Sequence, residues 1–272
     1  MNRRSVKRLA AVLLSAVLVA ACEHNPVEPT SRAAHQLAPT GALRVAVLTS
    51  NPIIGTRDPK TGEITGTTAT LAKILAKRAD VEVRMIEFTA IALLMQQANA
   101  GLWDIAVVAI DPARQGVVDF APPHLVAEGF LTVLVPPGST AKTMADIDQP
   151  GKRIAAVRAA APLMILERTL KNAKVVAAEN ENEAFALMRD GKAEGYAQNR
   201  FMLRARAQTL PGSRVLEDAF SGLRLAFALP KNRPEAAKFV AEFVEEIKRT
   251  GEIQNAIDAA GMKDEVRAAK FD

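Results

Sequence analysis

The chain is poor in the side chains that most often carry out chemistry. Of its 272 residues, one is cysteine, three are histidine and 4% are aromatic. His24 and His35 lie in a polar N-terminal segment, which leaves His124 as the single imidazole of the main body. A Ser-His-Asp triad or a His-rich metal site therefore has almost no material, and no disulfide framework can form. The scarcity of rings disfavours a site that stacks bases or sugars, and the absence of GxxxxGK[ST] leaves nucleotide hydrolysis unsupported.

The chain also has little excess positive charge outside its N-terminal segment. The formal net charge is +5, from 35 basic and 30 acidic residues. Four of the basic residues fall within residues 3–8, ahead of an apolar run over residues 9–21. This run is shorter than the roughly 20 apolar residues of a membrane span, and its basic flank is typical of a secretory signal. Removal of the signal leaves 31 basic against 30 acidic residues, so a nucleic-acid partner loses its main support.

The apolar run ends in Val-Ala-Ala-Cys at residues 19–22, which resembles a bacterial lipobox. We expect residues 1–21 to be a lipoprotein signal peptide and Cys22 to be acylated, so that the membrane is a partner through a lipid anchor. The alternative is an ordinary signal peptide with an incidental cysteine. Residues 22–40 are polar and contain three prolines, which predicts a flexible tether. Glu23, in place of an aspartate after the cysteine, favours the outer membrane if the host has one.

From residue 41 onward, short apolar runs alternate with amphipathic stretches, which predicts βαβ units and a mostly parallel sheet. The expected strands span residues 43–48, 81–88, 104–110, 129–135, 153–157, 174–178, 194–197 and 223–230. The expected helices span residues 68–79, 90–101, 161–172, 180–191 and 234–251, with a final helix after them. The pattern restarts midway, so we expect an α/β fold of two lobes. Lobe 1 would contain residues 41–132 and 227–272, and lobe 2 would contain residues 133–226, inserted into lobe 1.

The stretch AIDPARQGVVDFAPPH, residues 109–124, contains a helix-start signal and one cation. Asp111 is a good N-cap with Pro112 at the first helical position. If Asp111 entered a cleft instead, it would repel a carboxylate. Arg114 lies in the first turn, and two interpretations of it stay open. It holds a negatively charged ligand, or it pairs with Asp111 or Asp119 on a solvated surface.

Seven blocks of the chain, in this order, resemble the extracytoplasmic solute-binding proteins of ABC importers, in the family that includes the polar amino-acid binders. The blocks are GALRVAV, TGEITGTTATLAKILAKRA, LLMQQANAGLWDIAVVAI, DPARQGVVDFAPPH, MADIDQPGKRIAAV, ALMRDGKAEGYAQN and LAFALPKN. The resemblance covers residues 41 to about 260. It implies a periplasmic binding protein type II-like fold, with two α/β lobes joined by a two-strand hinge and a ligand cleft between them.

The same resemblance implies a periplasmic monomer that is not an enzyme and has no cofactor or metal. Such a protein closes on a small carboxylate-bearing solute, an amino acid or an organic acid, and delivers it to an ABC permease with its ATPase. Closure buries the ligand and strengthens its interaction with fixed charges.

The resemblance places Arg114 where the amino-acid binders clamp the ligand carboxylate, since a guanidinium offers two parallel donors to two oxygens. Other positions depart from the family pattern. Ala109 replaces a usual hydroxyl residue, so it contributes through its backbone N–H alone. Ile53 replaces a usual aromatic ring with an aliphatic wall, and Ala159-Ala160 replaces a usual Gly-Thr pair.

Three further positions bear on the ligand. Asn199 stands where the amino-acid binders have an aspartate for the α-ammonium, and it brings no charge to offset a buried cation. An organic acid or amide-like ligand is therefore favoured, and a register shift that places Gln198 there changes nothing, since neither is acidic. Arg158 adds a second positive charge to the cleft or is simply solvated. His124 lines the cleft mouth or has a plain packing or surface role.

Two other classes of function stay open from the sequence. A ligand sensor needs the same clamp as a transporter, so gene neighbourhood would separate them. An enzyme on the same fold, such as a dehydratase, would need an acid in the cleft, and the position best placed there is Asn199, an amide.

Overall fold

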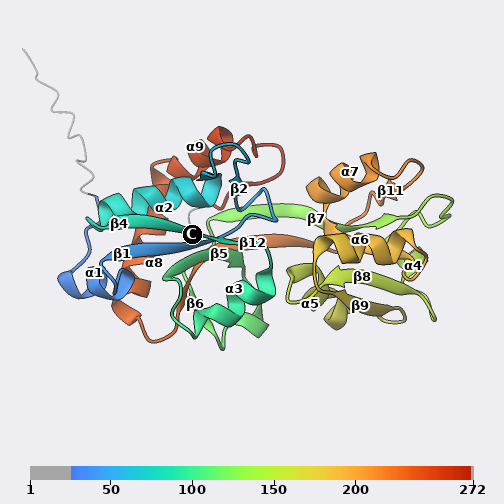
Figure 1. The fold of residues 1–272 in the computed structure, drawn as a ribbon, viewed down its shortest axis with the longest axis horizontal. Helices are drawn as coiled ribbons and strands as arrows, with labels where there is room; N and C mark the ends of the chain where they lie inside the picture. The colour runs from blue at the N-terminus through green and yellow to red at the C-terminus, as the bar shows by residue number, and fades with distance from the viewer. Residues whose placement is uncertain (1–25, 271–272) are drawn as a thin grey trace, which may run out of the picture.

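A mixed, curled sheet runs through the whole length of the molecule (Figure 1). The computed structural model describes residues 26–270, so the expected signal peptide and Cys22 lie outside the described residues. The strands of this sheet are β1 (Ala42–Leu48), β4 (Glu82–Phe88), β5 (Ile105–Ala109), β6 (Val118–Phe120), β7 (Leu125–Val135), β8 (Arg153–Val157), β9 (Lys174–Ala178), β10 (Gly195–Asn199), β11 (Arg214–Val215), β12 (Ser221–Pro230) and β13 (Arg267–Ala268). A small hairpin, β2 (Thr56–Arg57) and β3 (Ile64–Thr65), stands apart.

The strand order β4-β1-β5-β12-β7-β10-β8-β9 divides the sheet into two halves. Strands β4, β1 and β5 are parallel to one another, and so are β10, β8 and β9. Between these groups, β12 and β7 run antiparallel to each other and to their neighbours. The expected fold of two α/β lobes joined by two strands is therefore confirmed. The lobe limits at residues 132–133 and 226–227 fall inside β7 and β12, and these limits stay predictions.

Helices cover both halves of the sheet (Figure 1). Lobe 1 carries α1 (Ser31–Leu37), α2 (Thr67–Arg78), α3 (Ile91–Ala98), α8 (Pro234–Arg249) and α9 (Glu252–Ala259), and lobe 2 carries α4 (Met144–Ile147), α5 (Ala161–Thr169), α6 (Glu181–Arg189) and α7 (Arg200–Gln208). Helix α8 can be predicted from the sequence because its apolar residues recur with the helical period and form one buried face. The residues of this face are Phe239, Val240, Phe243, Val244 and Ile247. Within residues 26–270, no helix is long and apolar enough to cross a bilayer.

The expectation of a flexible tether up to residue 40 is wrong for its second half, which forms α1. The hydroxyl of Thr30 caps this helix by accepting a hydrogen bond from the N–H of Ala33 at 3.1 Å. Ala33 and Leu37 are buried in the lobe 1 core. Gln36 Oε1 accepts a hydrogen bond from the backbone N–H of Glu235, the start of α8, at 2.8 Å. Packing against α8 therefore stabilises this helix, which the polar composition of the segment does not predict.

A buried carboxylate ties the strands of lobe 1 to α8. Asp104 is fully buried, and its Oδ1 lies 2.8 Å from Arg44 Nη2 and 2.8 Å from Arg233 Nη1. Arg44 belongs to β1 and Arg233 immediately precedes α8. Because a buried charge is costly without partners, this three-residue group fixes how lobe 1 is assembled around β5.

Candidate functional site

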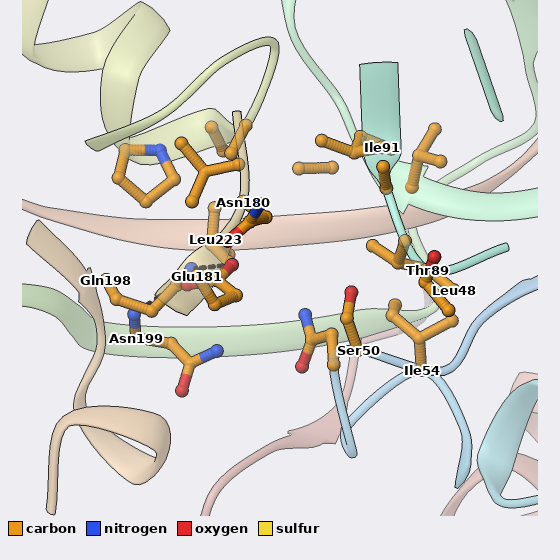
Figure 2. Close-up of a pocket in the computed structure, with 18 of the residues that line it drawn as sticks. Leu48, Ser50, Ile54, Thr89, Ile91, Asn180, Glu181, Gln198, Asn199 and Leu223 are labelled. Carbon is orange, nitrogen blue, oxygen red and sulfur yellow. Dashed lines mark hydrogen bonds between the residues drawn. The ribbon is translucent and has the colours of Figure 1, made fainter. Parts of the chain in front are cut away.

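A cavity, partly open to solvent, lies between the two lobes. It sits where β1, β5, β8 and β10 end, which is the edge where α/β sheets bind ligands. Figure 2 shows Leu48, Ser50, Ile54, Thr89 and Ile91 on the lobe 1 side, facing Asn180, Glu181, Gln198 and Asn199 on the lobe 2 side. Apolar walls with a few convergent polar groups are typical of a small-molecule site.

Arg114 lines this cavity and is 5% exposed. Its Nη1 donates to the carbonyl of Ala109 at 2.6 Å, and its Nη2 donates to the carbonyl of Ala159, in lobe 2, at 2.8 Å. Its Nε is buried and has no partner. Burial lowers the pKa of Arg114 to about 10, with the nearby charge of Asp111 acting in the opposite direction. The guanidinium therefore stays charged at neutral pH, and it faces the cavity rather than a solvated surface.

Asp111 has the capping role that the sequence predicts. Its carboxylate accepts a hydrogen bond from the N–H of Ala113 at 2.9 Å, although the helix it caps is a single 3₁₀ turn, Pro112–Arg114. The same carboxylate pairs across the lobes with Arg168 of α5, with Nη2 and Oδ2 2.7 Å apart. Burial acts to raise the pKa of Asp111, but the hydrogen bonds from Arg168 and Ala113 outweigh it and hold the pKa below its usual range. Asp111 is thus a contact between the lobes.

Asn199 ends β10, lines the cavity and is 1% exposed. Its side-chain oxygen accepts a hydrogen bond from the N–H of Met202 at 2.8 Å and so caps α7. Its amide nitrogen is buried without a partner. The neighbouring Gln198 also lines the cavity, but both ends of its amide are occupied: Oε1 accepts from the N–H of Asn199 at 2.8 Å, and Nε2 donates to Glu181 at 2.7 Å.

Glu181 is a cavity residue that the sequence reasoning missed. It is the first residue of α6, directly after the N-cap Asn180. Its carboxylate accepts hydrogen bonds from Gln198 and from the hydroxyl of Tyr196. Burial raises the pKa of Glu181, against the effect of these two hydrogen bonds. The sequence contained a signal for Glu181. An N-cap asparagine that follows a strand closely places the first residue of the helix at the carboxyl edge of the sheet.

Of the apolar residues predicted to line the site, the two alanines do so and the isoleucine does not. Ala109 and Ala160 line the cavity. The carbonyl of Ala109, rather than its N–H, contacts Arg114. Ile53 packs in the lobe 1 core and is absent from the cavity lining, and the next residue, Ile54, belongs to the same core and lines the cavity in its place.

Two surface ion pairs settle further alternatives. Arg158 is exposed, does not line the cavity and pairs with Glu179 at 2.9 Å. It is therefore a solvated cation and not a second positive charge in the cleft. Asp119 pairs with Lys231 at 2.5 Å, so it does not compete for Arg114.

His124 is fully buried and packs its ring on Phe227, with centroids 4.6 Å apart. Neither ring nitrogen has a hydrogen-bond partner. Burial lowers the pKa of His124 to about 3, with a smaller contribution from the charge of Lys248. Of the two roles considered for His124, the structure shows packing, because this residue is absent from the cavity lining.

Comparison with known proteins adds three findings. Residues 43–260 match the family described as bacterial extracellular solute-binding proteins, family 3. The glutamine-binding protein of Geobacillus stearothermophilus is 25% identical over 185 residues, which cover 66% of this chain and 70% of that protein. The virulence sensor protein BvgS of Bordetella bronchiseptica is 29% identical over 167 residues, and the match covers 60% of this chain but 12% of the sensor, so the chain spans a small part of that protein's length.

A solved structure shares the fold. The ancestral amino acid-binding protein AncCDT-1, a precursor of cyclohexadienyl dehydratase, superposes with a TM-score of 0.68 at 24% identity. The superposition covers 83% of this chain and 97% of the ancestral protein. The likeness extends over both lobes, so the two proteins share the two-lobed fold.

Proposed function

The chain belongs to the bacterial extracellular solute-binding proteins, family 3, and from this premise we propose that it captures a small carboxylate-bearing solute between its lobes and delivers it to the permease of an ABC importer. Membership and the similarity to glutamine-binding proteins support solute binding of the amino-acid transporter type. The carboxylate and the delivery step are our proposal. The solute leaves the protein chemically unchanged, and the protein works as a monomer.

Arg114 is the observation that carries this proposal. It is a buried cation that lines the cavity, it forms no ion pair among residues 26–270, and its Nε has no partner. A buried charge without a counter-ion is costly. Asp111 lies near Arg114 but forms its ion pair with Arg168, so a ligand carboxylate would supply a direct counter-charge and an acceptor, and hydrogen bonds between charged groups are the stronger kind. The cost of burying Arg114 is then offset when the ligand binds.

A thermal-shift screen of the mature domain tests the proposal. The panel contains the common amino acids, their 2-oxo and 2-hydroxy counterparts and short dicarboxylates. A ligand at 100 times its Kd stabilises the folded state by about 2.7 kcal/mol, which for a domain of this size raises Tm by roughly 5–10 °C. We expect Arg114→Met to abolish this rise while the Tm of the unliganded protein stays close to that of the wild type.

Arg158→Met is the matched control, because it removes the same charge from an exposed position outside the cavity. It should keep the full ligand-induced rise in Tm. If Arg114→Met also keeps the rise, the carboxylate clamp is wrong.

A role in signalling is a second candidate, favoured by the 29% identity to part of BvgS. A sensing domain would bind its solute through the same cavity and report to a receptor instead of a permease. Permease and ATPase genes next to the coding sequence would support import, and a sensor-kinase gene would support signalling.

We also propose that the protein is held at the membrane through Cys22, in the outer membrane of a host that has one. The lipobox-like residues 19–22 support this proposal. The mass of the protein purified from membranes should then fit a chain that begins at an acylated Cys22, and Cys22→Ser should release the protein from the membrane fraction.

A further inference from the structure

The asparagines that line the cavity share one orientation. Each has its side-chain oxygen bonded to a backbone N–H of its own loop or helix: Asn51 to Ile53 at 3.3 Å, Asn180 to Glu183 at 3.0 Å and Asn199 to Met202 at 2.8 Å. An amide whose oxygen is fixed in this way offers its NH₂ group to whatever lies beside it. The cavity therefore presents these amides as hydrogen-bond donors.

Two of the donors in the cavity are buried and unsatisfied. Asn199 Nδ2 comes from lobe 2 and Arg114 Nε from lobe 1, and both residues are at most 5% exposed. Figure 2 shows the amide nitrogen of Asn199 turned toward the space between the lobes, with its oxygen turned away. Because an unmet buried donor costs about 1–3 kcal/mol, each of them favours a ligand that brings an acceptor.

The carboxylate oxygens of the cavity already accept hydrogen bonds or pair with a cation, and the other side-chain oxygens without a fixed role are the hydroxyls of Ser50 and Thr89. Both oxygens of Glu181 accept hydrogen bonds, from Tyr196 and from Gln198. Glu179 is exposed at the rim and pairs with Arg158. A ligand ammonium near Asn199 would thus meet an NH₂ group in place of a free carboxylate.

Much of the remaining lining is aliphatic. Leu48, Ile54, Ile91, Leu223 and Leu225 contribute side chains to the lining. These walls suit an apolar ligand side chain of moderate size. Arg114 is the one cation of the lining and Glu179 and Glu181 are its acidic residues, so Arg114 can compensate one ligand carboxylate, whereas a second would stay uncompensated.

We propose that the cavity selects a 2-oxo or 2-hydroxy monocarboxylate with an aliphatic side chain over the α-amino acid with the same side chain. The carboxylate binds Arg114, and the neutral oxygen on the neighbouring carbon accepts a hydrogen bond from Asn199 Nδ2. This inference rests on the proposed function, because it identifies the class of solute that the same site binds.

Titration calorimetry with three matched probes tests the inference: 4-methyl-2-oxopentanoate, 2-hydroxy-4-methylpentanoate and leucine. We expect the oxo acid or the hydroxy acid to bind at least roughly tenfold more tightly than leucine, since the ammonium of leucine would face a donor and lose its hydration. Tighter binding of leucine would overturn the inference.

Asn199→Asp is the decisive variant, because aspartate caps a helix as well as asparagine does and the start of α7 is retained. The exchange replaces a donor by a charged acceptor. We expect the oxo acid to bind roughly tenfold more weakly and leucine roughly tenfold more tightly, so that the preference reverses. An unchanged ratio of the two Kd values would contradict the role of Asn199.

Asn182→Asp is the matched control. It makes the same change of charge at an exposed residue of α6 outside the cavity lining, and the oxygen that accepts a hydrogen bond from Arg206 is kept. The ratio of Kd values should stay within about threefold of the wild type, and a full reversal would show that net charge, not Asn199, sets the preference.

The failures of the two proposals are distinguishable. If an amino acid binds best and Arg114→Met abolishes its binding, the solute-binding proposal stands and the present inference fails. The same holds if none of the three probes binds while another amino acid does. If Arg114→Met leaves binding of every ligand in the screen intact, the carboxylate clamp itself fails.

Discussion

At the scale of single residues, His124 has the clearest consequence for stability. Its pKa is lowered from 6.5 to about 3 by burial, so it stays neutral in the folded protein while the unfolded chain takes up a proton below pH 6.5. A lowered histidine pKa therefore destabilises the fold as pH falls from 6.5 toward 3. The loss amounts to about 1.4 kcal/mol for each pH unit in this window.

We expect His124→Leu to remove this acid-dependent loss. The leucine keeps an apolar contact with Phe227, and His124 has no side-chain hydrogen bond to lose. Urea unfolding of both proteins at pH 7, 6, 5 and 4 measures the effect. The difference in free energy of unfolding, variant minus wild type, should grow by about 1.4 kcal/mol for each pH unit below 6.5. A difference that does not change with pH would contradict the burial of a neutral His124.

How well the sequence locates a cavity residue depends on how firmly the local pattern fixes the backbone at that position. Arg114 is recognisable because an Asp-Pro start fixes where its helical turn begins, and the cavity indeed contains it. Ile53 and Ile54 are chemically identical neighbours, so a one-residue difference in loop geometry decides which of them faces the cavity. Glu181 escapes notice because a run of acidic and amide residues at a helix start usually faces water.

At the scale of elements, the sequence predicts those that have a regular apolar period and misses those that depend on a partner. The strand over residues 153–157 and the helix beginning at residue 161 are found where expected. Helix α1 is missed because its stability comes from α8, some 200 residues away in the chain. Helix α7 is missed because it has Leu203 as its one buried residue.

Removing the packing of α1 should be measurable. Leu37 is fully buried in the lobe 1 core. Replacing it with alanine removes apolar contacts and leaves a cavity, so we expect Leu37→Ala to lower the free energy of unfolding by about 2–4 kcal/mol. Calorimetry should show a Tm roughly 5–12 °C lower.

Leu93→Ala, in α3, is the matched control, because Leu93 is 46% exposed. Its effect should stay within about 0.5 kcal/mol. If Leu37→Ala has an equally small effect, α1 is not an integral part of lobe 1.

At the scale of the whole molecule, the pair between Asp111 and Arg168 connects the two lobes beside the cavity. Asp111 is buried, while the side chain of Arg168 is 48% exposed. We expect Arg168→Gln to shift the population toward an open arrangement, because the pair exists when the lobes are closed. Half-exposed pairs contribute about 1 kcal/mol, so ligand Kd should rise roughly fivefold.

Small-angle scattering measures the shift as a larger radius of gyration of the ligand-free protein. Arg189→Gln is the control, because Arg189 pairs with the adjacent Asp190 within lobe 2. Its radius of gyration and ligand Kd should equal those of the wild type. An Arg168→Gln protein as compact as this control would show that the pair does not hold the lobes together.

The two-lobed plan follows from the sequence because the alternation of strands and helices stops and restarts. The direction of β7 and β12 does not follow from it, since a mainly apolar strand has a similar composition whether its neighbours run parallel or antiparallel. These two strands pair with each other, make the sheet continuous through both lobes and join lobe 1 to lobe 2 (Figure 1).

Helices α6 and α7 begin at Asn180 and Asn199, which also line the cavity. Asparagine, aspartate, serine and threonine all cap a helix well, yet they offer a ligand different groups: a donor, a charged acceptor or a hydroxyl that can do both. Most substitutions that alter a buried polar group weaken the fold. Exchange among caps is an exception, so a lineage of such proteins can move from one class of solute to another by single mutations without passing through an unstable ancestor.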